Sequence, residues 1–73
     1  MTEAGEIERE TQQIAEAIGK DVRALRRARG LTLQALADEI NRSVGYVSQI
    51  ERGISNLGVD DLRKLGAALN VPI

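Results

Sequence analysis

Residues 36–53 read LADEINRSVGYVSQIERG, and the helix-ending and helix-starting signals in this stretch decide the fold. Asn41 is the commonest substitute for glycine in the left-handed conformation that ends a helix. Ser43 follows almost at once, and serine is a preferred N-cap residue. Thr32 can cap the preceding helix in the same way. The stretch therefore predicts two short helices joined by a tight turn, near residues 33–40 and 44–52.

The apolar residues of these two segments recur at helical spacing, so each helix has one face that can be buried. The inward positions are Leu33, Leu36, Ala37 and Ile40 on the first helix, and Val47 and Ile50 on the second. The rest of the second helix is too polar for burial. A helix that starts a few residues after its predecessor and keeps one polar face exposed is the outline of a helix-turn-helix.

The flanking segments extend the helical pattern in both directions. A helix near residues 6–28 carries an apolar stripe formed by Ile14, Ile18, Val22 and Leu25. Gly19 interrupts that stripe at a cost of about 1 kcal/mol relative to alanine. A last helix near residues 59–69 carries the stripe Val59, Leu62, Leu65 and Leu69. The predicted fold class is all-α, with four helices and no sheet.

The composition excludes several classes of protein. Among the 73 residues there is no Cys and no His, which excludes disulfides, Cys/His zinc sites and the usual nucleophile–base pairs. We therefore expect no enzyme activity, no cofactor and no metal site. No apolar run approaches the roughly 20 residues of a membrane span, and the acidic start lacks a signal segment, so we expect a cytoplasmic protein.

The net charge of −1 hides an uneven distribution. Residues 1–20 hold five Glu against Arg9 and Lys20, a net of −3, whereas residues 21–54 hold six Arg against four acids, a net of +2. A mildly basic middle behind an acidic N-terminal arm is compatible with DNA binding but does not require it. We divide the chain into a flexible or helical acidic arm, 1–10, and a domain, 11–73.

Three motifs in order, RALRRARGLTLQALADEI, SVGYVSQIERG and DDLRKLGAALNVP, resemble the Cro/phage-repressor type of helix-turn-helix regulator, also called the XRE family. The resemblance covers roughly residues 18–73. It implies a compact four-helix bundle like that of the lambda repressor, or a five-helix bundle that is cut short. It also implies a bacterial or phage transcription regulator that binds double-stranded DNA with helix 44–52 in the major groove.

The resemblance assigns roles to individual residues. The residues for base readout are Val44, Gly45, Ser48 and Gln49, where Gln49 suits an adenine edge and Val44 a thymine methyl. The residues for phosphate or groove-wall contact are Thr32, Leu33, Arg42, Ser43, Tyr46, Arg52, Ser55 and Asn56. Gly45 brings no side chain to the groove, so we expect sparse base readout. Leu33 stands where the family often has a polar residue that reaches a phosphate.

Tyr46 is the only aromatic residue of the chain, and its position calls for a reason. It precedes Val47 by one residue and is therefore rotated about 100° from the buried face. An exposed ring with a hydroxyl tip suits a groove wall, where it can bond a phosphate. The alternative is that the ring folds over the neighbouring helix and shields part of the core.

Glu51 is an acid in the helix that would lie nearest to DNA, where direct contact with phosphate is unfavourable. Its spacing from Val47 and Ile50 turns it inward. The family pattern pairs this position with an arginine of the first helix, here Arg26. The resemblance therefore implies a partly buried structural ion pair between Arg26 and Glu51.

We expect the domain to bind as a weak homodimer that becomes cooperative on DNA. Its surfaces for pairing are limited to Ile7 with the outer stripe of the first helix, and to the last helix with Val71 and Ile73. The chain stops at Ile73, one residue after Pro72, as if another element followed, which suggests a C-terminal effector domain outside this chain. The competing hypothesis is a protein-interaction or antitoxin-like subunit that uses Ile7 and the acidic arm on a protein partner.

Overall fold

The computed structural model describes residues 3–54 and 57–71, with side chains from residue 9 onward. Four helices follow one another, and within these residues no strand is present. They are α1 (Glu3–Ala28), α2 (Leu33–Glu39), α3 (Val44–Glu51) and α4 (Val59–Leu69). The all-α prediction is confirmed, and the predicted bounds differ by at most one residue except at the start of α1, which begins three residues earlier.

The capping residues set the geometry of the turn between α2 and α3. The Thr32 hydroxyl accepts a hydrogen bond from the Ala35 amide at 3.0 Å, and the Ser43 hydroxyl accepts one from the Tyr46 amide at 3.1 Å. Both therefore act as N-caps, as predicted. Asn41 is left-handed with φ 58°, also as predicted, and the next amide, that of Arg42, donates to the Ala37 carbonyl. The chain reverses within these few residues and starts α3 across α2.

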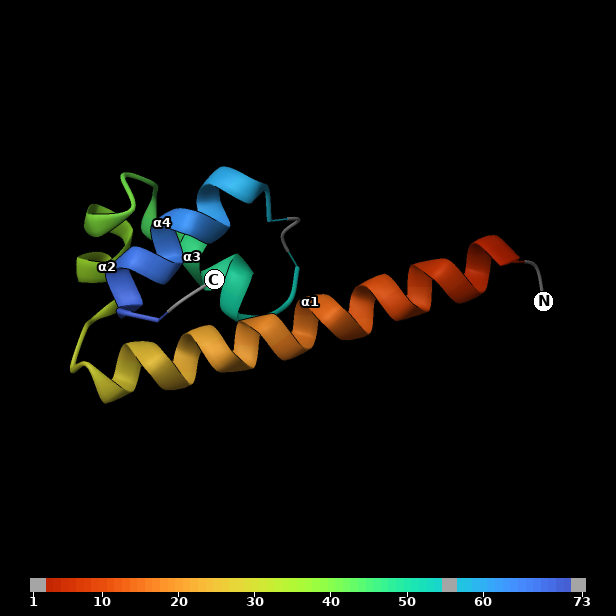
Figure 1. Ribbon diagram of the computed structural model, residues 1–73, viewed down its shortest axis with the longest axis horizontal. Coiled ribbons are helices and arrows are strands. Elements are labelled where there is room, and N and C mark those ends of the chain that lie inside the picture. The colour runs from red at the N-terminus through yellow and green to blue at the C-terminus, as the bar shows by residue number, and fades with distance from the viewer. Residues whose placement is uncertain (1–2, 55–56, 72–73) are drawn as a thin grey trace.

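One apolar core joins the three short helices to the second half of α1 (Figure 1). Its largest fully buried side chains come from α2, α3 and α4: Leu36, Ile40, Val47, Ile50 and Leu65. Val22 of α1 and Ala37, Ala68 and Leu69 complete the buried set. Most positions of the predicted apolar stripes thus meet in one place.

Two stripe positions were predicted incorrectly. Ile14 is 61% exposed because it lies where α1 leaves the bundle, and Val59 is 67% exposed because it lies in the first turn of α4. Leu33, Ile18, Leu25 and Leu62 are half-buried rather than central. The helical period was correct in each case, but a period cannot show where the body of the domain ends. The side chain of Ile7 and the residues Pro72 and Ile73 lie outside the described part of the chain.

α1 crosses α3 closely, and Gly19 makes this crossing possible. A Cβ atom at position 19 would lie 2.7 Å from the Glu51 carbonyl oxygen and closer still to that of Ile50. Two turns before Gly19 on α1, Gln12 donates a side-chain hydrogen bond to the carbonyl of Gly53, just after α3, at 3.1 Å. The glycine that breaks the apolar stripe therefore lets the backbone of α3 rest directly on α1.

The N-terminal part of α1 extends beyond the bundle and gives the molecule its longest dimension, 42 Å against 24 and 20 Å (Figure 1). α1 is continuous through residue 10, so the acidic arm and the body share one helix. Among the described residues, no helix is long and apolar enough to cross a membrane.

Candidate nucleic-acid interface

The outer face of α3 carries the four residues predicted to read bases. Val47 and Ile50 hold the opposite face in the core. Gly45 and Gln49 are exposed, Val44 is 41% exposed and Ser48 is half-buried. Within the described part of the chain the Gln49 amide makes no side-chain hydrogen bond, so its donor and its acceptor are both available. The structure thus brings the predicted readers together on one accessible surface.

The predicted phosphate-contact residues surround this surface but differ in how free they are. Thr32 and Ser43 are exposed at the helix starts, and each uses its hydroxyl oxygen as a cap acceptor. The O–H of each remains a donor for an outside group. Leu33 packs against the core and offers only its backbone. Ser55 and Asn56 lie outside the described residues.

Tyr46 is not free on the groove side, because its hydroxyl is bonded within the protein. The hydroxyl donates to Asp61 Oδ2 of α4 at 2.6 Å, and the ring packs against the core. The Arg42 guanidinium lies 4.1 Å from the centroid of that ring and 3.4 Å from the same carboxylate. Arg42, Tyr46 and Asp61 thus form a three-residue cluster, which we call the exposed cluster because the arginine remains 44% exposed.

The exposed cluster changes the chemistry of the tyrosine. Burial of the ring and the hydrogen bond to Asp61 raise the pKa of Tyr46, and the charge of Arg42 partly opposes this. The sequence analysis anticipated that the ring could cover the protein, although over α2 rather than toward α4. It did not find Asp61, which lies fifteen residues further along in the first turn of α4. Asp61 lies in the first turn of a predicted helix, where an acid already interacts favourably with the helix dipole. Its position in the sequence therefore gave no reason to pair it with Tyr46.

Arg26 and Glu51, the residues expected to pair, meet at the other end of α3. Arg26 Nε and Nη2 donate to the two carboxylate oxygens of Glu51 at 2.6 and 3.1 Å. Only 11% of the arginine side chain and 7% of the glutamate side chain are exposed. Arg26 Nη1 also donates to the Leu31 carbonyl at 2.9 Å, which ties the loop before α2 to the same group. We call this pair the buried pair.

The hydrogen bond to Glu51 raises the pKa of Arg26 against the opposing effect of burial. The Arg26 guanidinium therefore stays charged, and its two hydrogen bonds occupy both oxygens of Glu51. The net charge of the buried pair is zero, so the acid does not repel an anion that approaches α3.

A surface groove opens beside the buried pair, between α1, the start of α2 and α3. It is lined by Arg23, Arg26, Leu33, Ser48, Glu51 and Arg52. Arg52 is exposed, and its Nε makes only a long 3.4 Å bond to the Ser48 carbonyl. Arg23 is exposed as well, and the sequence analysis missed it, although its position three residues before Arg26 places it on the same side of α1.

Comparison with known proteins places this geometry in a family. The helix-turn-helix family model matches residues 22–73, and the chain belongs to this family. Within the described residues no cluster of three His, Cys, Asp or Glu side chains could hold a metal ion. The chain is a helix-turn-helix DNA-binding domain, similar to those of bacterial transcriptional regulators.

The relatives are transcriptional regulators. The transcriptional regulator ClgR of Mycobacterium tuberculosis is 33% identical over 60 residues, which cover 82% of this chain and 54% of that protein. The HTH-type transcriptional regulator SlrR of Bacillus subtilis is 39% identical over 57 residues, which cover 77% of this chain and 38% of that protein. The chain therefore spans about half, or less, of these curated relatives.

A solved structure supports the fold. The crystal structure of the clp gene regulator ClgR from C. glutamicum superposes with a TM-score of 0.78 at 34% identity, covering 81% of this chain and 76% of that one. The agreement confirms the four-helix fold and its helix-turn-helix. It also confirms the family resemblance seen in the sequence.

Proposed function

We propose that α3 enters the major groove of duplex DNA and reads a short half-site through Gln49, Ser48 and Val44. The observation that carries this proposal is the exposed, unbonded Gln49 on the face opposite Val47 and Ile50. A glutamine amide can bond an adenine edge with one donor and one acceptor, and a valine methyl can contact a thymine methyl. Gly45 lets the helix approach the bases closely.

Sugar and phosphate contacts position α3 in this proposal but carry no sequence information. Arg52 and the hydroxyls of Thr32 and Ser43 supply donors on two sides of α3. Arg42 and Tyr46 join them by exchanging Asp61 for a phosphate. The remaining positions are the backbone at Leu33, and Ser55 with Asn56, which follow α3 in the sequence.

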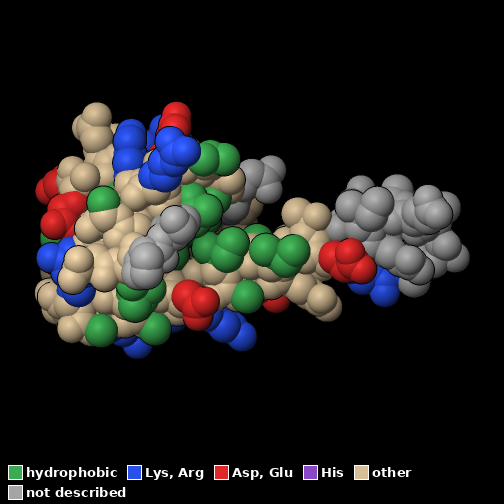
Figure 2. Space-filling view, viewed as in Figure 1, with side chains coloured by type: hydrophobic (Ala, Val, Ile, Leu, Met, Phe, Trp, Pro, Cys, Tyr) green, Lys and Arg blue, Asp and Glu red, His purple; other side chains and the backbone are tan. Residues whose placement is uncertain are grey.

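Two copies are needed for a specific complex in this proposal. A single module of this size buries only about 600–1,000 Å² on DNA, and this one offers few side chains for base edges. Doubling it across half-sites about 34 Å apart supplies the missing specificity. Hydrophobic side chains are exposed along α1 where it leaves the bundle, and Ile14 is 61% exposed (Figure 2). This surface is small, so pairing in free solution is weak and becomes cooperative on DNA.

The test is a titration of labelled duplexes, selected from a random pool, at two salt concentrations. Gln49→Ala should relax the preference at one base pair and lower affinity by about 1–3 kcal/mol. Gln13→Ala on the exposed surface of α1 is the matched control and should change neither. A duplex with two half-sites should bind more tightly than one half-site.

Two results would contradict the proposal. If Gln49→Ala and Gln13→Ala behave alike, α3 does not read bases. If the parent binds all duplexes weakly with little dependence on salt, the acidic part of α1 with Ile14 becomes the better candidate, as the binding surface for a protein partner. Equal affinity for one and two half-sites would remove the two-copy mechanism alone.

A further inference from the structure

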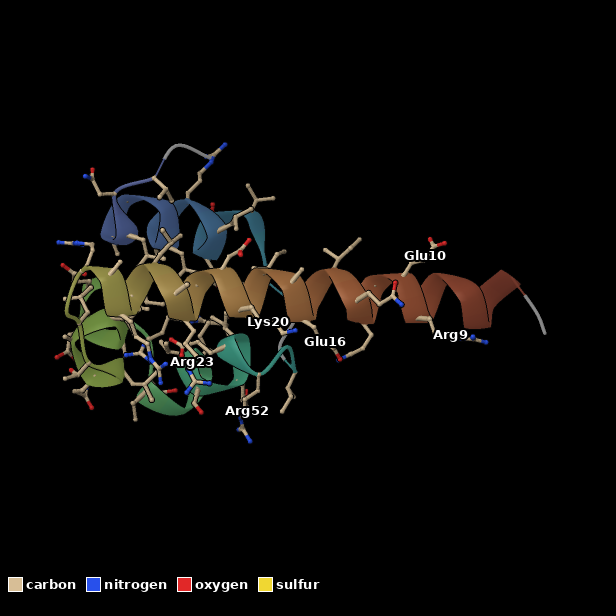
Figure 3. The ribbon with its side chains drawn as sticks, turned by 90° about the horizontal axis from the view of Figure 1, so that it is seen from below. Arg9, Glu10, Glu16, Lys20, Arg23 and Arg52 are labelled. Carbon is tan, nitrogen blue, oxygen red and sulfur yellow. The ribbon has the colours of Figure 1, made fainter. Side chains whose placement is uncertain are left out.

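The groove beside α3 is lined by two arginines in addition to Arg26, the arginine of the buried pair. Three arginines and one glutamate line it, and Glu51 is fully occupied by Arg26. Arg23 of α1 and Arg52, the C-cap residue of α3, remain as the other two cations of its lining. Figure 3 shows Lys20 and Arg23 leaving α1 toward the side on which α3 carries Arg52. The groove is therefore a positively charged surface on a chain whose net charge is −1.

The surroundings of Arg23 on its own helix add to this charge. The positions three and four residues away, which face the same side of a helix, are Gly19, Lys20, Arg26 and Arg27. None of them is acidic, and like charges at this spacing destabilise an isolated helix. Within the described residues Arg23 forms no hydrogen bond and no ion pair. A cation that occupies such a position without an internal partner points to an external anion.

We propose that Arg23 and Arg52 hold one phosphodiester of the DNA backbone between them, so that α1 contacts DNA beside the recognition helix. This inference rests on the proposed insertion of α3 into the major groove, and it extends the contact surface beyond the two helices of the motif. The anion is a backbone phosphate of the duplex whose bases α3 reads.

The shape of the groove suits this ligand. Guanidinium groups present planar donors that match phosphate oxygens in pairs. Leu33 supplies an apolar wall for the sugar, and Ser48 of α3 lines the same groove as the two arginines. A phosphate held here would follow the contour of α3, since Ser48 and Arg52 belong to the same helical segment as Gln49. One DNA strand can thus reach the groove and the readers together.

The experiment compares Arg23→Gln with Arg63→Gln, which removes the same charge from the exposed surface of α4. Affinity for a random-sequence duplex is measured over a series of salt concentrations, after thermal unfolding has shown that each variant folds. Arg23→Gln should lower affinity about three- to tenfold at low salt and reduce the slope of log K against log salt by about 0.9. Arg63→Gln should leave the slope unchanged, and Arg23→Lys should retain most of it.

The outcomes separate this inference from the proposed function. If the parent binds duplex DNA with a Gln49-dependent preference but Arg23→Gln keeps its slope, the inference is overturned while the function stands. The inference is also overturned if Arg63→Gln lowers the slope equally, because the effect is then only net charge. A parent that shows no salt-dependent duplex binding overturns both.

Discussion

The two ends of α3 are held in contrasting ways. At its C-terminal end the buried pair joins Glu51 to Arg26 of α1 with two short hydrogen bonds and almost no solvent contact. At its N-terminal end the exposed cluster joins Tyr46 to Asp61 of α4, with Arg42 open to water. The first contact holds the end of α3 against α1 away from solvent, whereas the second leaves the Arg42 guanidinium partly open to water. The helix α3 thus has one buried end and one solvent-accessible end.

Burial decides the difference between these ends, because charge alone does not. Both ends use an arginine and a carboxylate at close range. In water such a pair contributes about 0–1 kcal/mol, while removal of one partner from a buried pair costs about 3–5 kcal/mol. The same chemistry should therefore contribute more to stability at the buried end of α3 than at the exposed end.

The largest expected effect is the loss of the buried pair. Glu51→Ala leaves the Arg26 charge buried without a partner and should lower the free energy of unfolding by about 3–5 kcal/mol. A core of this size rarely supplies more than about that amount, so the variant should be largely unfolded. Asp61→Ala in the exposed cluster should lower it by only about 1–2 kcal/mol.

Urea unfolding followed by circular dichroism measures both variants. Replacement of Arg26 and Glu51 together by apolar residues of similar size should cost much less than Glu51→Ala, since no charge is left unpaired. If Glu51→Ala and Asp61→Ala melted alike, the contrast between the two ends of α3 would be lost.

The next largest effect on stability is expected at Gly19, where α1 crosses the end of α3. Gly→Ala inside a helix normally stabilises by about 1 kcal/mol, but a Cβ at position 19 would meet the backbone of Glu51 at 2.7 Å. The helices must separate, and overpacking of this kind costs about 1–3 kcal/mol. We therefore expect Gly19→Ala to destabilise the domain.

Gly45→Ala is the matched control for this prediction. A Cβ there has only the Ser43 hydroxyl oxygen near it, at 4.0 Å, so the ordinary gain in helix propensity should appear. Thermal unfolding of both variants shows whether each substitution raises or lowers the stability of the domain. A Gly19→Ala variant that is more stable than the parent would show that α3 does not rest on α1 as described.

The sequence was sufficient to predict those features of the fold that depend on neighbouring residues. Thr32, Asn41 and Ser43 define helix ends within a few residues of themselves, so their roles could be inferred directly. The spacing of Glu51 from Ile50 turned it inward, and the family pattern supplied Arg26 as its partner. The structure places these two groups together.

What the sequence did not predict depends on contacts between distant elements. Nothing near Gly19 shows that the end of α3 rests on it, and nothing near Tyr46 points to Asp61 on another helix. Ile14 and Val59 fit their helical periods, but their exposure follows from where the bundle ends. Which of the predicted residues contact DNA stays a prediction, since it depends on a partner outside the chain.

The smallest expected effect is the titration of Tyr46 in the exposed cluster. Burial and the Asp61 carboxylate raise its pKa above the ordinary value of about 10, and Arg42 acts in the opposite sense. The neutral phenol is thus favoured in the folded state. Its contribution to stability is complete below about pH 10 and is lost as pH rises through the folded pKa. Because the chain has one Tyr and no Trp or Phe, phenolate absorbance follows this group alone.

The two partners of Tyr46 should move its titration midpoint in opposite directions. Asp61→Ala removes the acceptor that favours the protonated hydroxyl and should lower the midpoint, while Arg42→Ala removes the cation that favours phenolate and should raise it. Opposite shifts would show that all three groups interact in the free protein. Shifts in the same direction, or no shift in either variant, would contradict the exposed cluster.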